Sequence, residues 1–398
     1  MATTSQQVRD YRGPALFSFG FRPFFLLGAL WAAVSVPLWI VTYAAGPDAL
    51  PVNAGLAFHV HEMVFGYGSA IVAGFLLTAV PNWTGRLPVC GLPLMVLVTV
   101  WVAGRAAMLF QPGPGWVPAM VDSAFMVLFA GIIWREVIAG QNTRNLKVAG
   151  AVSLLALANI AFHWISLDDG GLPQAAIRAG LGTLLFLILL IGGRITPSFT
   201  RNWLARQGGP LPEAAGRIDA VALAVSFAAL AVWAVFGGTL AASILLLVAG
   251  ILNGLRLSRW GGERTLAEPL VTVLHVGYAW AALAIVLIGL SGLWPEHVPR
   301  IAGLHAAGAG AVGVMTLAVM TRSSLGHTGR ALTAGAGTLV IYGLVNVAAL
   351  ARVAAPFLDQ PYQMHANFLA SALWSGAFLG FVFVYGPRLV SPRLGKAA

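Results

Sequence analysis

Apolar segments long enough to cross a lipid bilayer recur along almost the whole chain of 398 residues. A helix needs ~20 mostly apolar residues to span the hydrocarbon core. Breaks at proline, glycine and charged residues give twelve such segments, near residues 24–43, 56–79, 91–110, 118–138, 146–167, 175–193, 218–237, 240–258, 269–290, 300–321, 331–354 and 365–386. The sequence therefore predicts an all-α fold, a polytopic transmembrane helix bundle with about twelve spans.

The composition also indicates a membrane protein. Charged residues make up 9% of the chain, against ~25% of an ordinary soluble domain. Hydrophobic residues reach 59%, and glycine (47 residues) and tryptophan (13 residues) are abundant, as in packed helix bundles with aromatic belts. The formal net charge is +10, but the basic residues are scattered singly between apolar segments. We interpret these residues as loop charges that set the orientation of the protein in the lipid bilayer. No nucleic-acid partner is expected.

The distribution of charge favours twelve spans over eleven. The weakest break between spans is the Gly237–Gly238 pair, and merging the segments there would leave eleven. With twelve spans and a cytoplasmic N-terminus, most of the 23 basic residues fall on the cytoplasmic side, as the positive-inside rule requires. The exceptions are Arg105, Arg178, Arg300 and Arg352, and the opposite loops carry Asp48, Asp168, Asp169, Glu296 and Asp359. We expect both termini in the cytoplasm and one integral membrane domain over residues 1–398.

Five of the eight histidines are expected at one depth, near the outer surface of the membrane. They are His59 and His61 in the second span, His163 in the fifth, His305 in the tenth and His365 in the twelfth. Ionisable side chains are costly inside a bilayer and mark functional sites. Imidazole is also the commonest protein ligand of haem iron and copper. The layer therefore predicts a metal or haem centre near the outer surface.

Several of the eight histidines also have structural explanations, including those outside this layer. His275 is expected toward the cytoplasmic side of the ninth span, where it either binds haem or forms a hydrogen bond across helices. His327 follows the tenth span and is either a metal ligand or a contact to backbone or phosphate. His163 and His365 could instead serve as an interfacial anchor and as a hydrogen-bonding residue at a helix start. His297, in an outer loop, is expected to be solvated.

The densest chemistry lies in the segment A-F-H-V-H-E-M, residues 57–63. Residues two apart on a helix point ~200° apart, so His59 and His61 cannot share one metal without unwinding and would reach two centres. Met63 lies on the His59 face, either as a soft ligand for copper or haem or as a core residue. Glu62 and Asp122 are acids within spans, and such acids must be protonated, paired or engaged in proton transfer. Both are candidate catalytic residues.

The candidate ligands form two overlapping sets. The candidate metal ligands are His59, His61, His163, His305, His327 and Met63. The candidate haem-binding residues are His59, His61, His275, His305 and His365, together with the outer-end arginines Arg105, Arg178, Arg300 and Arg352. A guanidinium matches the two oxygens of a haem propionate, but an arginine at this depth can equally extend its charged end to the interface.

Several kinds of site are excluded by the sequence. The single cysteine, Cys90, excludes an intramolecular disulfide and any multi-cysteine zinc or iron–sulfur site. There is no phosphate-binding loop of the form G-x-x-x-x-G-K-[ST] and no C-x-x-C-H haem attachment motif. Any haem is therefore expected to be bound non-covalently, and ATP-driven chemistry is not expected. The N-terminal residues have no apolar core, so no cleavable signal peptide is expected.

Long strings of the sequence resemble the NnrS family. They are F-S-F-G-F-R-P-F-F (17–25), H-V-H-E-M (59–63), G-F-L-L-T-A-V-P-N-W-T-G-R (74–86), R-I-T-P-S-F-T-R-N-W (194–203), L-H-V-G-Y-A-W (274–280) and M-T-L-A-V-M-T-R-S-S-L-G-H-T-G-R (315–330). The resemblance implies a multi-pass protein of the bacterial inner (cytoplasmic) membrane that contains haem and copper. It also implies a part in nitric-oxide metabolism, denitrification and resistance to nitrosative stress. The family's histidines correspond to His59, His61, His275, His305 and His327, and less closely to His163 and His365.

These features together favour an oxidoreductase with haem b and copper that resembles a nitric-oxide reductase. Joining two NO molecules requires electrons, protons and a metal site, and Glu62 and Asp122 are candidates to deliver the protons. The sequence encodes no soluble donor domain or nucleotide site, so membrane quinol is the expected electron donor. Two alternatives stay open: a proton-coupled transporter of a metal or an NO adduct, and a non-catalytic haem-based sensor or sink for NO.

Overall fold

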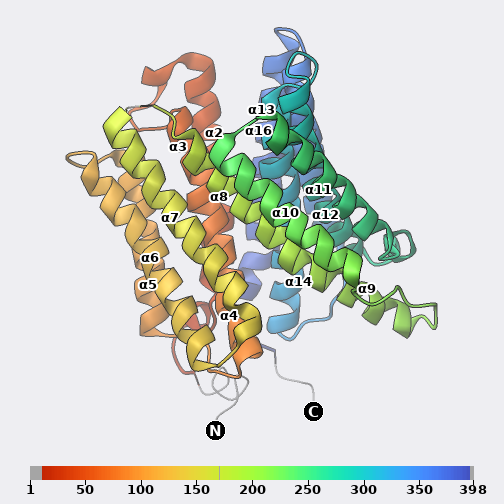
Figure 1. The fold of residues 1–398 in the computed structure, drawn as a ribbon. Coiled ribbons are helices and arrows are strands. Elements are labelled where there is room, and N and C mark those ends of the chain that lie inside the picture. Colours follow the sequence, from red (N-terminus) through yellow and green to blue (C-terminus); the bar gives the residue numbers. More distant parts are fainter. Residues whose placement is uncertain (1–10, 170, 395–398) are drawn as a thin grey trace. The chain divides into compact units, whose positions relative to one another are not determined.

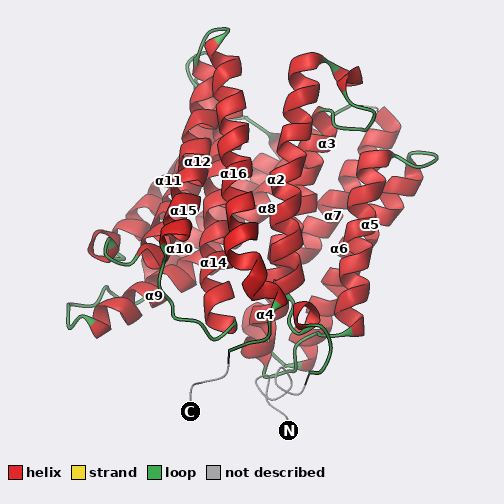
Figure 2. Cartoon of the chain, turned by 180° about the vertical axis from the view of Figure 1, so that it is seen from behind, coloured by secondary structure: helices red, strands yellow, loops and turns green. Residues whose placement is uncertain are grey.

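The computed structural model of the chain describes residues 11–169 and 171–394. Within these residues the regular structure is entirely helical, and twelve helices are long and apolar enough to cross a membrane. Figure 1 and Figure 2 show these helices, and the prediction of an all-α bundle with about twelve spans is confirmed. The ends of the chain, residues 1–10 and 395–398, lie outside the described residues. The cytoplasmic placement of both termini therefore stays a prediction.

By their internal contacts the residues form two compact units. The first unit comprises Met1–Gly180, Ser323–Ala331 and Phe381–Ala398. Its second span runs from α3 (Leu56–His61) through the π-helix η3 (Glu62–Gly68) into α4 (Ser69–Thr84). The other helices that lie wholly within this unit are α2 (Phe21–Ala45), α5 (Leu92–Phe110), α6 (Trp116–Ala139) and α7 (Leu146–Asp169).

The second unit comprises Leu181–Arg322 and Leu332–Gly380. Three long helices have residues in both units: α8 (Gln174–Leu187) begins in the first unit, and α14 (Met315–His327) and α16 (Tyr362–Val390) end there. The remaining helices of the second unit are η5 (Ile188–Gly192), α9 (Gly193–Arg206), α10 (Arg217–Phe236), α11 (Leu240–Ser258), α12 (Pro269–Leu293), α13 (Arg300–His305), η7 (Ala306–Val314) and α15 (Ala336–Ala354). The expected break at Gly237–Gly238 is present, between α10 and α11.

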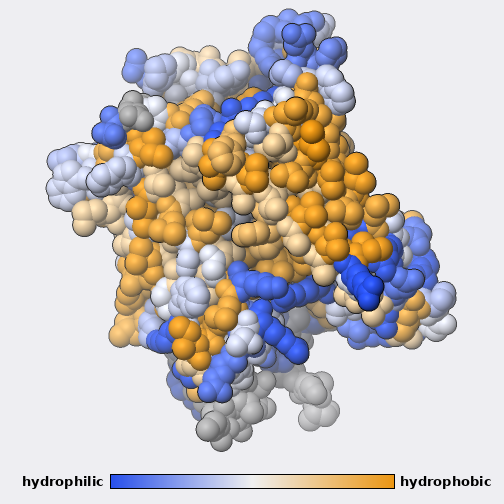
Figure 3. Space-filling view, viewed as in Figure 1, coloured by the Kyte–Doolittle hydropathy of each residue, from blue (hydrophilic) through white to orange (hydrophobic). Residues whose placement is uncertain are grey.

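The surface of the helices is apolar, as expected for contact with lipid. Figure 3 shows mainly apolar residues along the helices and hydrophilic residues gathered near helix ends. Large apolar side chains such as Leu157, Val235 and Phe383 are more than 60% exposed. Exposure of so much apolar surface is unfavourable in water but matches helix faces that contact lipid tails.

The sixth span is longer than the sequence predicts, because the helix continues to Arg206 instead of ending near residue 193. The segment after Gly193 contains Arg194, Pro197 and Arg201, residues that in the sequence predict a polar loop. Proline has no N–H and leaves the carbonyl four residues earlier, that of Gly193, without its helical partner. Arg256 Nη2 donates to this carbonyl oxygen at 3.2 Å. A buried arginine from α11 therefore allows the helix to pass through the proline.

Three spans contain a π-helical stretch, at η3, η5 and η7. A π-turn inserts one extra residue into the helix and leaves carbonyls outside the regular hydrogen-bond pattern. Such stretches are frequent at functional sites. Two of the three directly follow a predicted ligand, since η3 begins after His61 and η7 begins after His305.

Candidate functional site

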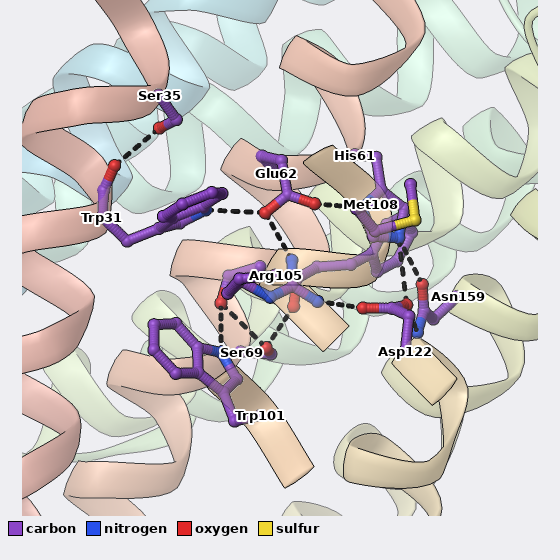
Figure 4. Close-up of polar contacts among 12 residues, drawn as sticks. Trp31, Ser35, His61, Glu62, Ser69, Trp101, Arg105, Met108, Asp122 and Asn159 are labelled. Carbon is purple, nitrogen blue, oxygen red and sulfur yellow. Dashed lines mark hydrogen bonds and ion pairs between the residues drawn. The ribbon is translucent and has the colours of Figure 1, made fainter. Parts of the chain in front are cut away.

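Six polar and charged side chains meet inside the first unit. His61 and Glu62 come from the second span, and the others come from α5, α6 and α7: Arg105, Asp122, Asn159 and His163. Figure 4 shows Glu62, Arg105, Asp122 and Asn159 around His61. His61 and Glu62 are 0% exposed and Asp122 is 1% exposed. We call these six residues the buried cluster, and groups so enclosed are tolerated only when they are paired.

The Glu62 carboxylate is held by three neighbours. Its Oε2 accepts hydrogen bonds from Trp31 Nε1, at 2.6 Å, and from Arg105 Nη1. Its Oε1 lies 2.9 Å from His61 Nδ1. Beside the Arg105 cation the carboxylate is ionised and can only accept hydrogen bonds. His61 Nδ1 therefore carries a proton and donates a hydrogen bond to Glu62 Oε1.

The Asp122 carboxylate joins the remaining members of the buried cluster. Its Oδ1 accepts from Arg105 Nη2, so a single guanidinium bridges both acids. Its Oδ2 accepts from Asn159 Nδ2 at 2.8 Å and lies 2.8 Å from His163 Nε2. The same oxygen is 3.2 Å from His61 Nε2. Asp122 Oδ2 is therefore the point at which both imidazoles meet.

Two oxygen acceptors face the second nitrogen of His61. Because Asn159 donates its amide nitrogen to Asp122, its Oδ1 is turned toward His61 Nε2, at 2.9 Å. Asp122 Oδ2 is the other acceptor. Since His61 Nδ1 already carries a proton, Nε2 must either carry a second proton or use its lone pair to share a cation with these oxygens. A bound cation at this point would satisfy both oxygen acceptors and the Nε2 lone pair.

The net charge of the buried cluster also favours a bound cation. Glu62 and Asp122 contribute two negative charges and Arg105 contributes one positive charge, so with neutral imidazoles the net charge is −1. An unbalanced charge is costly in a group of side chains so thoroughly removed from water. One added proton, or a bound metal cation, would offset it.

The same side chains form a suitable set of metal ligands. His61, Asp122 and His163 each offer one ligand atom, and these atoms all lie within 4.8 Å of one another. Two imidazole nitrogens and a carboxylate oxygen suit copper, zinc or non-haem iron. Histidines that bind metals usually donate their other N–H to a carboxylate or carbonyl, as His61 does to Glu62. The donor set, its second contact and its charge therefore all fit a metal ion.

The π-helix η3 brings the second span close to Arg105. Gly66 O accepts hydrogen bonds from Trp101 Nε1 at 3.0 Å and from Ser69 Oγ at 3.2 Å, so side chains satisfy this carbonyl. Gly66 lies one turn after Glu62, and an added Cβ there would overlap with the Arg105 guanidinium and the Glu62 carboxylate. Glycine at this position allows the ion pair to form against the helix backbone.

His59 and His61 contact different neighbours, as expected for residues two apart on a helix. The His59 ring stacks on Trp39, with centroids 5.5 Å apart and planes at 17°. The His61 ring packs instead against Phe162 and His163, at 5.1 and 4.8 Å. The structure therefore places His61, and not His59, in the buried cluster. Met63 is partly buried.

His275 forms a hydrogen bond to a threonine on another helix, and His327 packs against two phenylalanine rings. Thr200 donates its hydroxyl proton to Thr196 O at 2.9 Å, so its oxygen accepts from His275 Nε2 at 2.8 Å. His275 thereby links α12 to α9 within the second unit, which is the hydrogen bond across helices that the sequence left open. In the first unit the His327 ring packs against Phe19 and Phe21, at 5.6 and 5.4 Å.

His305 and His365 belong to the second unit. His305 ends α13, and its Nδ1 lies 2.9 Å from Ile301 O. A carbonyl oxygen only accepts, so Nδ1 carries the proton and Nε2 carries the lone pair. One turn further on, a Cβ added at Gly308 would meet no atom within 4 Å. His365 lies exposed in the first turn of α16.

The four arginines expected near haem propionates have different surroundings. Arg105 is 4% exposed and bridges two protein carboxylates, so both of its terminal nitrogens already have acidic partners. Arg178 on α8 and Arg352 on α15 are partly buried, whereas Arg300 at the start of α13 is exposed. The structure therefore gives Arg105 a role in the buried cluster that the sequence analysis did not foresee.

Two contributors to the buried cluster were missed from the sequence. Asn159 lies four residues before His163 on α7 and therefore on the same helix face, a spacing that could have identified it. Trp31 donates to Glu62 from α2, and nothing in the sequence distinguishes it from the other twelve tryptophans. Its contact depends on how α2 is rotated against the second span.

The chain matches a known protein family over nearly its whole length. A comparison with curated proteins found no match for this chain. The family model described as NnrS protein matches residues 15–393, which include every helix that contributes to the buried cluster. The chain therefore belongs to the NnrS family, a family associated with nitric-oxide metabolism and with haem and copper.

Proposed function

We propose that this protein reduces nitric oxide in the bacterial inner membrane, with haem b and copper as cofactors and membrane quinol as the electron donor. Two NO molecules and one quinol would give N₂O, water and quinone, so that the two electrons and two protons of the quinol balance the reaction. The observation that carries the proposal is the enclosed set of His61, Asp122 and His163 in a chain of the NnrS family.

These three residues would hold the copper ion. The ligand atoms would be Nε2 of His61, Nε2 of His163 and Oδ2 of Asp122, which already converge. Imidazole nitrogen with a carboxylate oxygen is a donor set that copper accepts readily. Copper bound there would supply a redox-active Lewis acid for NO. Asp122, a candidate proton donor from the sequence, is in this proposal a ligand.

The surrounding residues would orient the ligands. Glu62 holds the proton on His61 Nδ1 and so keeps the Nε2 lone pair directed at the ion. Arg105 fixes Glu62 and Asp122 relative to each other, and Asn159 orients Asp122 Oδ2. Phe65 and Phe162 pack against the His61 ring and keep water from it. A small uncharged molecule such as NO can enter such an apolar environment without a large desolvation cost.

The buried cluster does not suit a haem. The His61 ring is fully enclosed, and both of its nitrogens have partners, so a macrocycle would have to displace them. His305 is a better haem ligand, because its Nδ1–H donates to Ile301 O and thereby places the lone pair on Nε2. This is the tautomer that a haem-ligating histidine adopts. Gly308 leaves space on the same helix one turn away.

Anaerobic NO consumption by the purified protein tests the proposal. With a reduced quinol analogue we expect continuous consumption of NO with formation of N₂O, and a b-type pyridine haemochrome. His163→Leu should abolish turnover, whereas His297→Leu, an exposed histidine outside the buried cluster, should not. A single stoichiometric burst would instead indicate a sink or sensor. No consumption, together with movement of protons or metal across vesicles, would indicate a transporter, and a colourless protein from haem-replete cells would contradict the haem.

A further inference from the structure

Four arginines and one histidine lie together in the first unit, away from the buried cluster. Arg22 lies in the first turn of α2, and His327 ends α14. Arg330 follows α14, and Arg388 and Arg393 lie at and beyond the end of α16. Each is close enough to a positively charged neighbour to be repelled by it: Arg22 by Arg330, Arg330 by Arg388, and a protonated His327 by both Arg22 and Arg393. We call these residues the basic group.

No carboxylate of the described residues forms an ion pair with the basic group. The ion pairs of the described chain involve other arginines, such as Arg86 and Arg135 with Glu136. Arg22 has a different kind of compensation, because it is 2% exposed and its Nη1 donates to Leu389 O and Ser391 O, both at 2.7 Å. Carbonyls at a helix C-terminus carry partial negative charge and stabilise a cation. Among the described residues, the other three arginines have no such set of carbonyls.

The end of α14 fixes the position of Arg330. Arg330 N donates to Leu325 O at 3.0 Å and Gly329 N donates to Gly326 O at 3.3 Å, which together form a Schellman motif. Gly329 has φ +77° and could not accept a side chain without strain. Leu394 N donates to Thr328 O at 3.0 Å and so ties the segment that carries Arg393 to this turn. The backbone therefore brings Arg330 and Arg393 together.

The charge of Arg330 is poorly balanced by the protein. Its Nη1 is enclosed and has no hydrogen-bond partner among the described residues. Burial, and then the positive charge of Arg388, lower the pKa of Arg330, which shows that its surroundings oppose the cation. Like charges held together in this way are stabilised by a bound anion, and guanidinium groups match phosphate oxygens in particular.

The basic group lies where phospholipid head groups are found. Membrane-spanning helices begin at Phe21 and end at His327 and Val390, so all its members are at or just beyond the ends of spans. Basic pockets at this level of a membrane protein bind anionic head groups.

We infer that Arg330, Arg388 and Arg393 form a binding site for a phosphate-bearing anion, occupied by the head group of an anionic phospholipid. The site is independent of the chemistry at the buried cluster. Its role would be to hold the start of α2 and the ends of α14 and α16 together through one shared anion. Arg22 would contribute a positive charge held in place by the carbonyls of Leu389 and Ser391.

Native mass spectrometry of the purified protein, with phosphatidylglycerol or phosphatidylcholine added, tests the inference. We expect the wild-type protein to retain phosphatidylglycerol selectively, and Arg330→Gln and Arg393→Gln each to weaken retention about fivefold. Arg393 is exposed, so its substitution should not impair folding. The matched control is Arg135→Gln, which removes the same charge from an arginine that is paired with Glu136.

A second measurement separates lipid from free phosphate. Inorganic phosphate is titrated into delipidated protein while thermal unfolding is followed. A saturable rise in the unfolding midpoint that Arg330→Gln abolishes would support the phosphate site with a soluble ligand as its source. Equal retention of both lipids, or equal retention of phosphatidylglycerol by wild type and by both site variants, without a phosphate effect, would overturn the inference.

Discussion

Arg105 is the residue on which the buried cluster depends most. It is 4% exposed and bridges Glu62 and Asp122, whose carboxylates would otherwise repel each other in a space without water. The net value of a buried ion pair is small, because removing the charges from water costs about as much as their attraction returns. Removal of one partner is a different matter, since the remaining charges then stay buried without compensation.

We therefore predict that Arg105→Gln destabilises the protein by roughly 3–5 kcal/mol. The double variant Arg105→Gln/Glu62→Gln should recover part of this loss, because it removes one of the two unpaired carboxylates. Thermal unfolding in detergent measures both effects. Arg86→Gln is the control, since Arg86 is 41% exposed in its pair with Glu136 and such surface pairs contribute ~0–1 kcal/mol. Equal effects of Arg105→Gln and Arg86→Gln would contradict the account.

The sequence identified most of the residues of the buried cluster but not their partners. Depth in the membrane follows from the hydrophobic pattern, and it placed His61 and His163 in one layer and singled out Glu62, Asp122 and Arg105. The rotation of each helix about its axis depends on side-chain packing, which no pattern in a single sequence fixes. For this reason Arg105 is expected from the sequence at haem propionates or at the interface rather than beside the acids, and Asn159 and Trp31 are not found.

At the level of elements, the π-helix η3 determines whether the buried cluster can form. It places Gly66 against the ion pair of Glu62 and Arg105, and Trp101 and Ser69 satisfy the Gly66 carbonyl. A comparable arrangement supports the sixth span, where Arg256 donates to Leu189 O and Gly193 O beside η5. In both places a side chain replaces a hydrogen bond that the regular helix would have made.

Gly66→Ala tests the role of η3. The added Cβ would overlap with the Arg105 guanidinium and the Glu62 carboxylate, so we expect loss of bound metal and a lower unfolding temperature. Gly150→Ala on α7 is the matched control, because a Cβ there meets no atom within 4 Å. Alanine is a better helix former by roughly 0.5–1 kcal/mol, so the control should be neutral or slightly stabilising. Full metal content in Gly66→Ala would show that η3 tolerates the side chain.

The spans could be predicted from the sequence, whereas the irregular stretches within them could not. Long apolar windows identify a membrane helix by composition alone, and all twelve were found. A π-turn has no comparable signal, since it arises from the balance between side-chain packing and backbone hydrogen bonds. The extension of the sixth span beyond Gly193 was missed for a related reason, because its polar residues and Pro197 resemble a loop unless the contact with Arg256 is known.

At the level of the whole molecule, orientation follows from charge. The positive-inside rule places the loop after the sixth span in the cytoplasm and the loop after the first span outside. In a Cys90→Ser background, a membrane-impermeant maleimide added to right-side-out vesicles should label Asp48→Cys and not Gln207→Cys. Both positions are exposed, so the difference reports only on sidedness. Labelling of Gln207→Cys alone would show that the orientation is opposite to the predicted one and that the histidine layer lies on the cytoplasmic side.

We propose that His61, Asp122 and His163 hold a copper ion inside the first unit. Copper analysis combined with electron paramagnetic resonance of the oxidised protein tests it most directly. We expect one copper ion at this site, with hyperfine splitting from two imidazole nitrogens. His163→Leu should lose one of these nitrogens or lose the copper altogether, while His297→Leu should leave the spectrum unchanged. A protein without copper after growth in copper-replete medium, or a spectrum that is the same in wild type, His61→Leu and His163→Leu, would contradict the claim.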